Sequence, residues 1–162
     1  MQLIIDGHNL IPHLPGIALS DPDDESQLVN WLLSYCRMTR SKVTVFFDQA
    51  AVGYSGVRVH GAVRAHYVRK GRTADDAIIV HLKKLGKAAR NYAVVSSDRV
   101  VAAAARSMHA QVLSSEAFAA TLTHLSEQEP EIDPRSRLLN SDEVDEWQAL
   151  FEHHRRSKKY SK

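Results

Sequence analysis

The sequence predicts a three-layer α/β fold, in which a central and mainly parallel sheet is flanked by helices and followed by a C-terminal helical tail. Short apolar runs at residues 3–6, 43–48 and 92–97 alternate with stretches whose apolar side chains recur at helical spacing. The first two runs have the composition of strands that are buried on both faces. Because right-handed crossovers place helices on both faces of a parallel sheet, this alternation predicts three layers.

The first third of the chain predicts a strand, a helix and a second strand. Residues 3–6 form the first strand, and the β-branched and aromatic residues 43–48 form the second; each run ends in an aspartate. Between them, a helix is expected over residues 24–38, after a cluster of Ser and Asp residues of the kind that caps helices. Its inward stripe consists of Leu28, Leu32, Tyr35 and Cys36.

The middle of the chain predicts a more exposed strand and a well-capped helix. Residues 63–69 alternate enough for a half-buried strand. Thr73 is expected to cap a helix over residues 74–85, and Gly86 is expected to end it. Three apolar side chains of this helix should face inward: Ile78, Leu82 and Leu85.

Two further strand and helix pairs complete the expected domain. A buried strand over residues 92–97 closes on Asp98 and precedes an alanine-rich helix. A short strand over residues 111–113 then leads to a helix that either Ser114 or Ser115 caps. The inward stripes are Val101, Ala105 and Met108 in the first helix, and Phe118, Leu122 and Leu125 in the second.

The chain divides into a folded domain over residues 1–125, a linker over residues 126–140 and a C-terminal segment over residues 141–162. The linker contains prolines and charges without periodicity. The C-terminal segment predicts an amphipathic helix followed by a basic tail. The apolar stripe of this helix, which includes Trp147 and Phe151, has three candidate contacts: its own domain, a second copy of the chain in a homodimer, or another protein.

The composition of the chain limits the classes of protein to which it can belong. The chain has 162 residues, 44% hydrophobic and 25% charged, which is enough to bury a core without disulfides. A net charge of +2 indicates no particular partner. The single Cys36 lies among apolar residues and is expected to be a buried, reduced thiol. No stretch approaches the apolar length of a membrane span, so a cytoplasmic protein without membrane contact is expected.

Acidic residues follow several of the predicted strands. Asp6, Asp48 and Asp98 end strands, and Asp75 with Asp76 opens a helix that should start at the same edge of the sheet. Ligands of open parallel sheets bind beyond the carboxyl ends of the strands. Clustered carboxylates repel one another unless a cation lies among them, and oxygen ligands favour Mg²⁺ or Mn²⁺ over Zn²⁺. The sequence therefore predicts a divalent-metal site that can activate water for attack on a phosphodiester.

Each candidate also has a purely structural explanation. Acids at strand ends and in first helical turns are common because they are solvated and interact favourably with the helix dipole. Helical phase places Asp75 above the inward stripe and Asp76 about a third of a turn away, which does not decide between them as ligands. Asn9 can face the same edge or cap the following turn. The joint occurrence of the acids favours a site.

Residues 49–74 contain no acid and combine basic with aromatic side chains. Such a segment can hold a phosphate backbone and stack bases, although a solvated surface would have the same composition. The candidate nucleic-acid contacts are Arg58, Arg64, Arg69, Lys70 and Arg72. No histidine has the spacing of a zinc hydrolase, and no phosphate-binding loop, dinucleotide fingerprint or nucleophile elbow occurs.

Four motifs resemble those of NYN domains in the PIN-like nuclease superfamily, most closely the bacterial YacP-like branch. They are DGHNLI at residues 6–11, VFFD at 45–48, TADDAI at 73–78 and VVSSDR at 94–99. The resemblance runs from residue 2 to about residue 122 and implies that residues 1–125 form a PIN-like NYN nuclease domain. In this fold, acids on a parallel sheet bind Mg²⁺ or Mn²⁺ and cleave RNA.

The resemblance also implies which residues form the site. Asp6, Asp98 and either or both of Asp75 and Asp76 correspond to the metal-binding and catalytic acids. The expected neighbours of these acids are Asn9, Asp48 and Ser97. Many relatives have a Glu in the helix motif, where this chain has two Asp side chains with shorter arms.

The expected function is therefore metal-dependent endoribonuclease activity on single-stranded or loop RNA. RNA is the expected partner, and the ribosome is a further candidate partner. Two other functions fit the same features: an RNA- or ribosome-associated adaptor with little hydrolytic activity, and a structure-specific DNA nuclease. RNA binding that EDTA does not affect would favour the adaptor, and parallel cleavage assays on RNA and DNA would identify a DNA nuclease.

Overall fold

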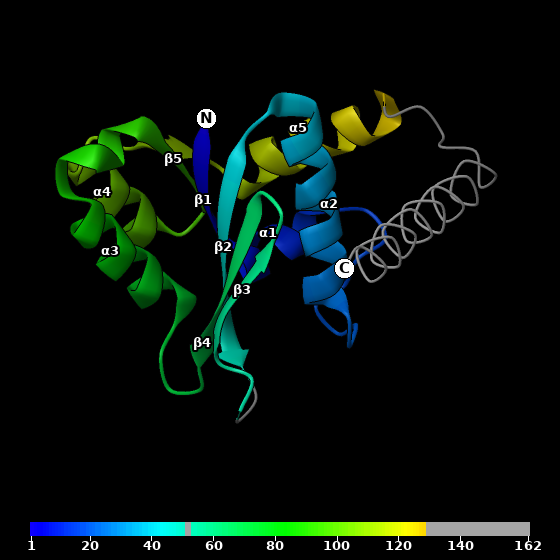
Figure 1. The fold of residues 1–162 in the computed structure, drawn as a ribbon, viewed down its shortest axis with the longest axis horizontal. Helices are drawn as coiled ribbons and strands as arrows, with labels where there is room; N and C mark the ends of the chain where they lie inside the picture. The colour runs from blue at the N-terminus through cyan, green and yellow to red at the C-terminus, as the bar shows by residue number, and fades with distance from the viewer. Residues whose placement is uncertain (51–52, 129–162) are drawn as a thin grey trace, which may run out of the picture. The chain divides into compact units, whose positions relative to one another are not determined.

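The computed structural model describes residues 1–50 and 53–128, and it confirms the predicted α/β class. A six-stranded sheet has the order β3-β4-β2-β1-β5-β6 (Figure 1). Its strands are β1 (Gln2–Asp6), β2 (Lys42–Ala50), β3 (Gly56–His60), β4 (Val63–Arg69), β5 (Tyr92–Val95) and β6 (Gln111–Leu113). All neighbouring strands are parallel except β3 and β4, which pair antiparallel.

Helices cover both faces of the sheet. The helical elements are α1 (Gly7–Leu10), η1 (Ile11–His13), α2 (Asp24–Thr39), α3 (Ala74–Leu85), η2 (Gly86–Asn91), α4 (Arg99–Ser107) and α5 (Ser115–Gln128). In Figure 1, α3 and α4 lie on one side of the sheet, and α2 and α5 lie on the other. The three layers predicted from the alternating pattern are therefore present.

Two hydrophobic cores result from the alternation of side chains along the strands. Leu3 and Ile5 of β1 face the core that α1, α2 and α5 cover, whereas Ile4 faces the core that α3 and α4 cover. Both cores are shielded from solvent at the centre, since each of these three residues is at most 1% exposed. This double burial explains why β1 is apolar throughout its length.

The strand order places a topological switch point beside β1. The chain leaves β1 toward β2, β4 and β3, and then returns to pair β5 with the opposite edge of β1. In open α/β sheets, the crevice at the carboxyl ends of the strands next to such a reversal is the usual ligand site. Asp6 is the last residue of β1, so the topology brings this acid to that crevice.

Several predicted boundaries are confirmed. The strands over residues 63–69 and 111–113 agree with β4 and β6, and Thr73 caps α3 by accepting the backbone N–H of Asp76 at 3.1 Å. Gly86 ends α3 with a φ of 54°, a conformation that favours glycine. Residues 92–97 form a shorter strand than predicted, because ladder pairing stops at Val95 and the chain turns into a loop.

Other features differ from the prediction or lie outside the described residues. Strand β3 was not predicted, because all five of its residues are exposed and no buried pattern marks it. Helix α5 continues to Gln128, three residues beyond the expected end of the domain. The expected C-terminal helix and basic tail lie outside the described residues. Among residues 1–50 and 53–128, no helix is long and apolar enough to cross a membrane.

Candidate active site

Asp6 is a buried acid at the carboxyl end of the central strand. Its side chain, in a residue that is only 6% exposed, accepts the backbone N–H of Asn9 at 3.4 Å, which caps α1. Burial raises the pKa of Asp6 to about 7, and a hydrogen bond and charge repulsion with Asp75 add to the increase. The nearby charge of Asp48 acts in the same direction. Asp6 and Asp75 therefore interact directly, although 68 residues separate them in the chain.

The structure distinguishes Asp75 from Asp76. Both lie in the first turn of α3, but only Asp75 interacts with Asp6, and Asp75 is half-buried whereas Asp76 is exposed. Asp76 instead lines a groove beside α3 that also contains Arg69 and Arg72. Asp75 thus faces β1 because it lies on the same side of α3 as the inward apolar side chains.

Asp98 lies in the loop after β5 and caps helix α4. One of its carboxylate oxygens, Oδ1, accepts the backbone N–H groups of Val100 at 2.8 Å and Val101 at 3.0 Å. This is the usual N-cap interaction, which satisfies N–H groups that have no partner within the helix. The capping contact fixes the backbone at Asp98 and leaves its second oxygen, Oδ2, outside these two hydrogen bonds.

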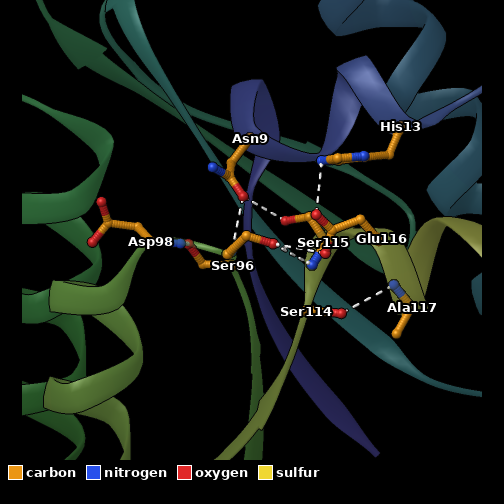
Figure 2. A network of polar contacts seen from close by, with 9 residues as sticks. Asn9, His13, Ser96, Asp98, Ser114, Ser115, Glu116 and Ala117 are labelled. Carbon is orange, nitrogen blue, oxygen red and sulfur yellow. Dashed lines mark hydrogen bonds and ion pairs between the residues drawn. The ribbon is translucent and has the colours of Figure 1, made fainter.

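Asn9 and Ser97 connect the loop after β5 to the first helical turn. The side-chain oxygen of Asn9 accepts two hydrogen bonds, from the backbone N–H of Ser97 at 2.9 Å and from the hydroxyl of Ser115 at 2.5 Å. Figure 2 shows the contact between Asn9 and Ser115. The hydroxyl of Ser97 accepts the backbone N–H of Ser115 at 3.0 Å and donates to Glu116 at 3.3 Å. The two predicted neighbours thus hold together three segments that surround the acids.

A histidine between two carboxylates forms the other side of the site. His8 contacts Asp48 through Nδ1 at 2.6 Å and Glu25 through Nε2 at 3.2 Å. The hydrogen bond with Glu25 raises the pKa of His8 to about 9, and Asp48 adds to the increase, while burial opposes it. His8 is therefore a cation at neutral pH and compensates the charge of Asp48, which lies beside Asp6.

Sequence analysis did not identify His8 or Glu25 as site residues. His8 has no motif spacing that marks a functional histidine, because it acts through ion pairs with residues 17 and 40 positions away. One sequence signal was present. Asp48 lies two residues before the end of β2, which is longer than predicted and parallel to β1. Because Asp6 pairs with Phe46, the side chain that follows Asp6 by two residues can be expected to meet Asp48.

The five candidate nucleic-acid contacts separate in the structure. Arg69 and Arg72 line the groove beside α3. Arg64 lies on the same side of the sheet, because its charge acts on His66 and His81, which also line the groove. Arg58 pairs across from Ala65 on the other face, and its guanidinium lies 4.1 Å from the centre of the Tyr54 ring. Lys70 is exposed in the turn after β4.

Comparison with known proteins decides the family. A model of the YacP-like NYN domain matches residues 3–156. The chain belongs to the YacP-like NYN domain family. Its fold is similar to the crystal structure of Rae1 (YacP) from Bacillus subtilis, with a TM-score of 0.65, 22% identity, and coverage of 98% of this chain and 92% of that chain. The W164L mutant of that protein gives a TM-score of 0.64 at 22% identity, over 86% and 84% of the two chains.

No curated protein matches the chain. The NYN assignment nevertheless places it among PIN-like nuclease domains. The expected family and fold are both confirmed, and the four motifs that carried the resemblance fall on the carboxyl ends of β1, β2 and β5 and on the start of α3.

The acid pair of this NYN domain fits a hard divalent cation with few protein ligands. Within the described residues, no three side chains of the His, Cys, Asp and Glu types are grouped so that they could hold one ion. Mg²⁺ commonly binds one or two carboxylates and keeps several waters until phosphate oxygens replace them. The Asp6–Asp75 pair supplies two carboxylates, and a cation between them would relieve the repulsion that helps to raise the pKa of Asp6.

Proposed function

We propose that the chain is a Mg²⁺- or Mn²⁺-dependent endoribonuclease that cleaves single-stranded or loop RNA. The observation that carries this proposal is the buried contact between Asp6 and Asp75, which come from distant segments and meet at the switch point of an NYN domain. A structural role alone gives no reason to bury two like charges together, because either carboxylate would be more stable in water. Cation binding gives such a reason.

The proposed roles follow from the positions of the acids. Asp6 and Asp75 would hold the ion, and Asp98 would act on waters of the ion from the loop after β5, since the described residues do not group three acids around one ion. A bound divalent ion would supply a nucleophilic water at neutral pH and stabilise the charge on the phosphodiester. Asp76, which lines the groove beside α3, would orient substrate or outer waters rather than share the ion directly.

The surrounding residues would position the RNA and support the acids. Arg69 and Arg72 lie on the α3 side of the sheet, where they would bind backbone phosphates. His8 would hold Asp48 and limit the negative charge beside Asp6. The ribosome remains a candidate partner and the cytoplasm the proposed location, to which the free and buried Cys36 lends support.

The test compares Asp75→Asn with Asp76→Asn in cleavage of end-labelled single-stranded RNA and DNA of matched sequence. With Mn²⁺ or Mg²⁺, the chain should cleave RNA, and EDTA should stop cleavage. Asp75→Asn should lose roughly 100-fold or more of the rate, as expected when a group that stabilises charge in the transition state is removed. Asp76→Asn, which removes the same charge one residue away, should lose clearly less of the rate than Asp75→Asn, because Asp76 does not interact with Asp6.

Three results would contradict the proposal or part of it. Cleavage that survives in both Asp6→Asn and Asp75→Asn would remove the acid pair from the reaction. Equal cleavage of DNA and RNA would favour the DNA nuclease instead. RNA binding without cleavage at any metal concentration would favour the adaptor, provided that addition of ribosomes does not restore cleavage.

A further inference from the structure

A groove runs beside α3 on the face of the sheet opposite α2. It has a volume of about 880 Å³ and lies between α3 and strands β3 and β4. Asp76, Val80 and Lys84 line its helical side and follow one another at a spacing of four residues. At a rise of about 1.5 Å per residue, the helical wall from Asp76 to Lys84 is about 12 Å long. One end of the groove is therefore adjacent to Asp75, and the other is two helical turns away.

The charges of the groove lie at its rim. Arg69, Arg72 and Lys84 are exposed cations that line it, and Asp76 is the acid among the lining residues. The lining histidines, His66 and His81, do not add to this charge at neutral pH, because burial lowers the pKa of each and neighbouring cations lower it further. The groove thus has a basic rim and an uncharged interior.

Packed aromatic and imidazole rings line the interior of the groove. The His66 ring stacks on Phe46 with a centroid distance of 4.6 Å, and His81 meets the Phe46 ring edge-on at 5.6 Å. The two imidazole centroids lie 6.0 Å apart. The Nε2 atom of His66 is buried and has no hydrogen-bond partner among the described residues. A buried polar atom without a partner is unfavourable.

We propose that this groove is a nucleotide-binding subsite of the nuclease, in which the RNA strand leaves the acid pair with its phosphates on Arg69, Arg72 and Lys84 and with a base against the histidine-lined floor. The inference rests on the proposed function, since it assigns the groove to the same RNA. It adds Lys84, His66 and His81 as residues that bind substrate.

The chemistry favours a single-stranded nucleic acid over a peptide. Regularly spaced phosphates fit cations at the rim, and the flat faces of bases fit aromatic walls. An acidic peptide would satisfy the rim but would leave the ring-lined floor without a matching group. The groove also begins next to the proposed site of cleavage, because Asp76 lines the groove and the adjacent Asp75 contacts Asp6.

The test is fluorescence anisotropy of a labelled single-stranded RNA with the full chain in EDTA, where cleavage is stopped. Lys84→Ala should weaken binding about fivefold to tenfold. The matched control is Lys83→Ala, which removes the same charge from the neighbouring exposed residue. Lys83 lines a separate hollow with Lys87 and Arg90, so its replacement should change affinity less than about twofold.

A second comparison tests the floor. RNA with abasic positions should bind the unmodified chain more weakly than intact RNA, by about fivefold or more for each base that stacks. In His81→Ala this difference should be reduced, and a thermal melt would verify that the variant is folded. A competing acidic peptide should not displace RNA; displacement at similar concentration would overturn the assignment to RNA.

The outcomes separate the two proposals. Equal losses of RNA affinity in Lys83→Ala and Lys84→Ala, or no loss in either, would overturn the proposal that the groove binds RNA. Such a result would not affect the proposal that the acid pair cleaves RNA. If Asp6→Asn and Asp75→Asn cleave as well as the unmodified chain, the proposed function fails. A selective loss of binding in Lys84→Ala would still stand in that case, because it is measured without cleavage.

Discussion

Replacing Asp6 with asparagine removes one charge from the acid pair and preserves the shape of the side chain. An asparagine oxygen can still accept the backbone N–H of Asn9, and its amide can donate to Asp75. The substitution therefore separates the electrostatic cost of the pair from its packing. We expect Asp6→Asn to stop cleavage and to raise the free energy of unfolding when no divalent cation is present.

The size of the effect follows from proton linkage. The pKa of Asp6 is raised from 3.8 to about 7 in the folded chain. Between these values the folded state holds more protons than the unfolded state, so stability falls as pH rises from about 4 to about 7 and is constant above. A shift of about three units corresponds to about 4 kcal/mol at most. Asparagine does not titrate, so the variant should be about 2–4 kcal/mol more stable than the unmodified chain at pH 8.

Urea unfolding in EDTA at pH 5 and pH 8 would measure this difference. The advantage of the variant should be large at pH 8 and much smaller at pH 5, where the unmodified chain holds its proton. Saturating Mn²⁺ should reduce or reverse the difference at pH 8, because a ligand at 100 times its Kd adds about 2.7 kcal/mol to the form that binds it. Asp76→Asn, an exposed control, should change stability by less than about 0.5 kcal/mol.

Two results would refute the reasoning. An asparagine variant no more stable than the unmodified chain at pH 8 would mean that the carboxylates of Asp6 and Asp75 do not oppose folding. A gain of the same size at pH 5 and pH 8 would mean that packing, rather than charge, causes it.

Two further substitutions test the structure around the acids. Gly7→Ala should cost about 1–3 kcal/mol in thermal unfolding, because an added Cβ would collide with the buried Phe47 ring and lie 3.0 Å from the carbonyl oxygen of Phe46; an unchanged melting temperature would contradict this packing. His8→Gln should lower the free energy of unfolding by about 1–2 kcal/mol at pH 6.5, where protonated His8 pairs with Asp48 and Glu25. The loss should disappear as pH rises through about 9, because His8 then becomes neutral. A loss that persists at pH 10 would show that the ion pair is not its origin.

The parts of this molecule that sequence predicted are those in which local and long-range forces agree. Helix α3 begins at Thr73 and ends at Gly86 because capping, apolar phase and turn chemistry all favour the same bounds. Strand β1 is buried on both faces and is therefore apolar along its length. Asp6 at its end stands out from this apolar run, which made it recognisable as a candidate site residue.

The parts that were missed depend on contacts between distant residues. Strand β3 is exposed on both faces and pairs with β4 through its backbone, so no buried apolar pattern marks it in the sequence. The choice between Asp75 and Asp76 required the position of β1 relative to α3. The groove escaped prediction because Phe46, His66 and His81 come from three elements, and their rings meet only after the sheet forms.

The hydrogen bond between Asn9 and Ser115 has a consequence for synthesis of the protein. It joins residues 106 positions apart, and β1 pairs with a strand that begins at residue 92. The first strand therefore leaves the ribosome long before its second neighbour exists, and such long-range pairing folds slowly. A chain that is still being made cannot assemble this edge of the sheet until nearly the whole domain has emerged. Activity would then appear abruptly, at the end of translation of the domain, rather than gradually during it.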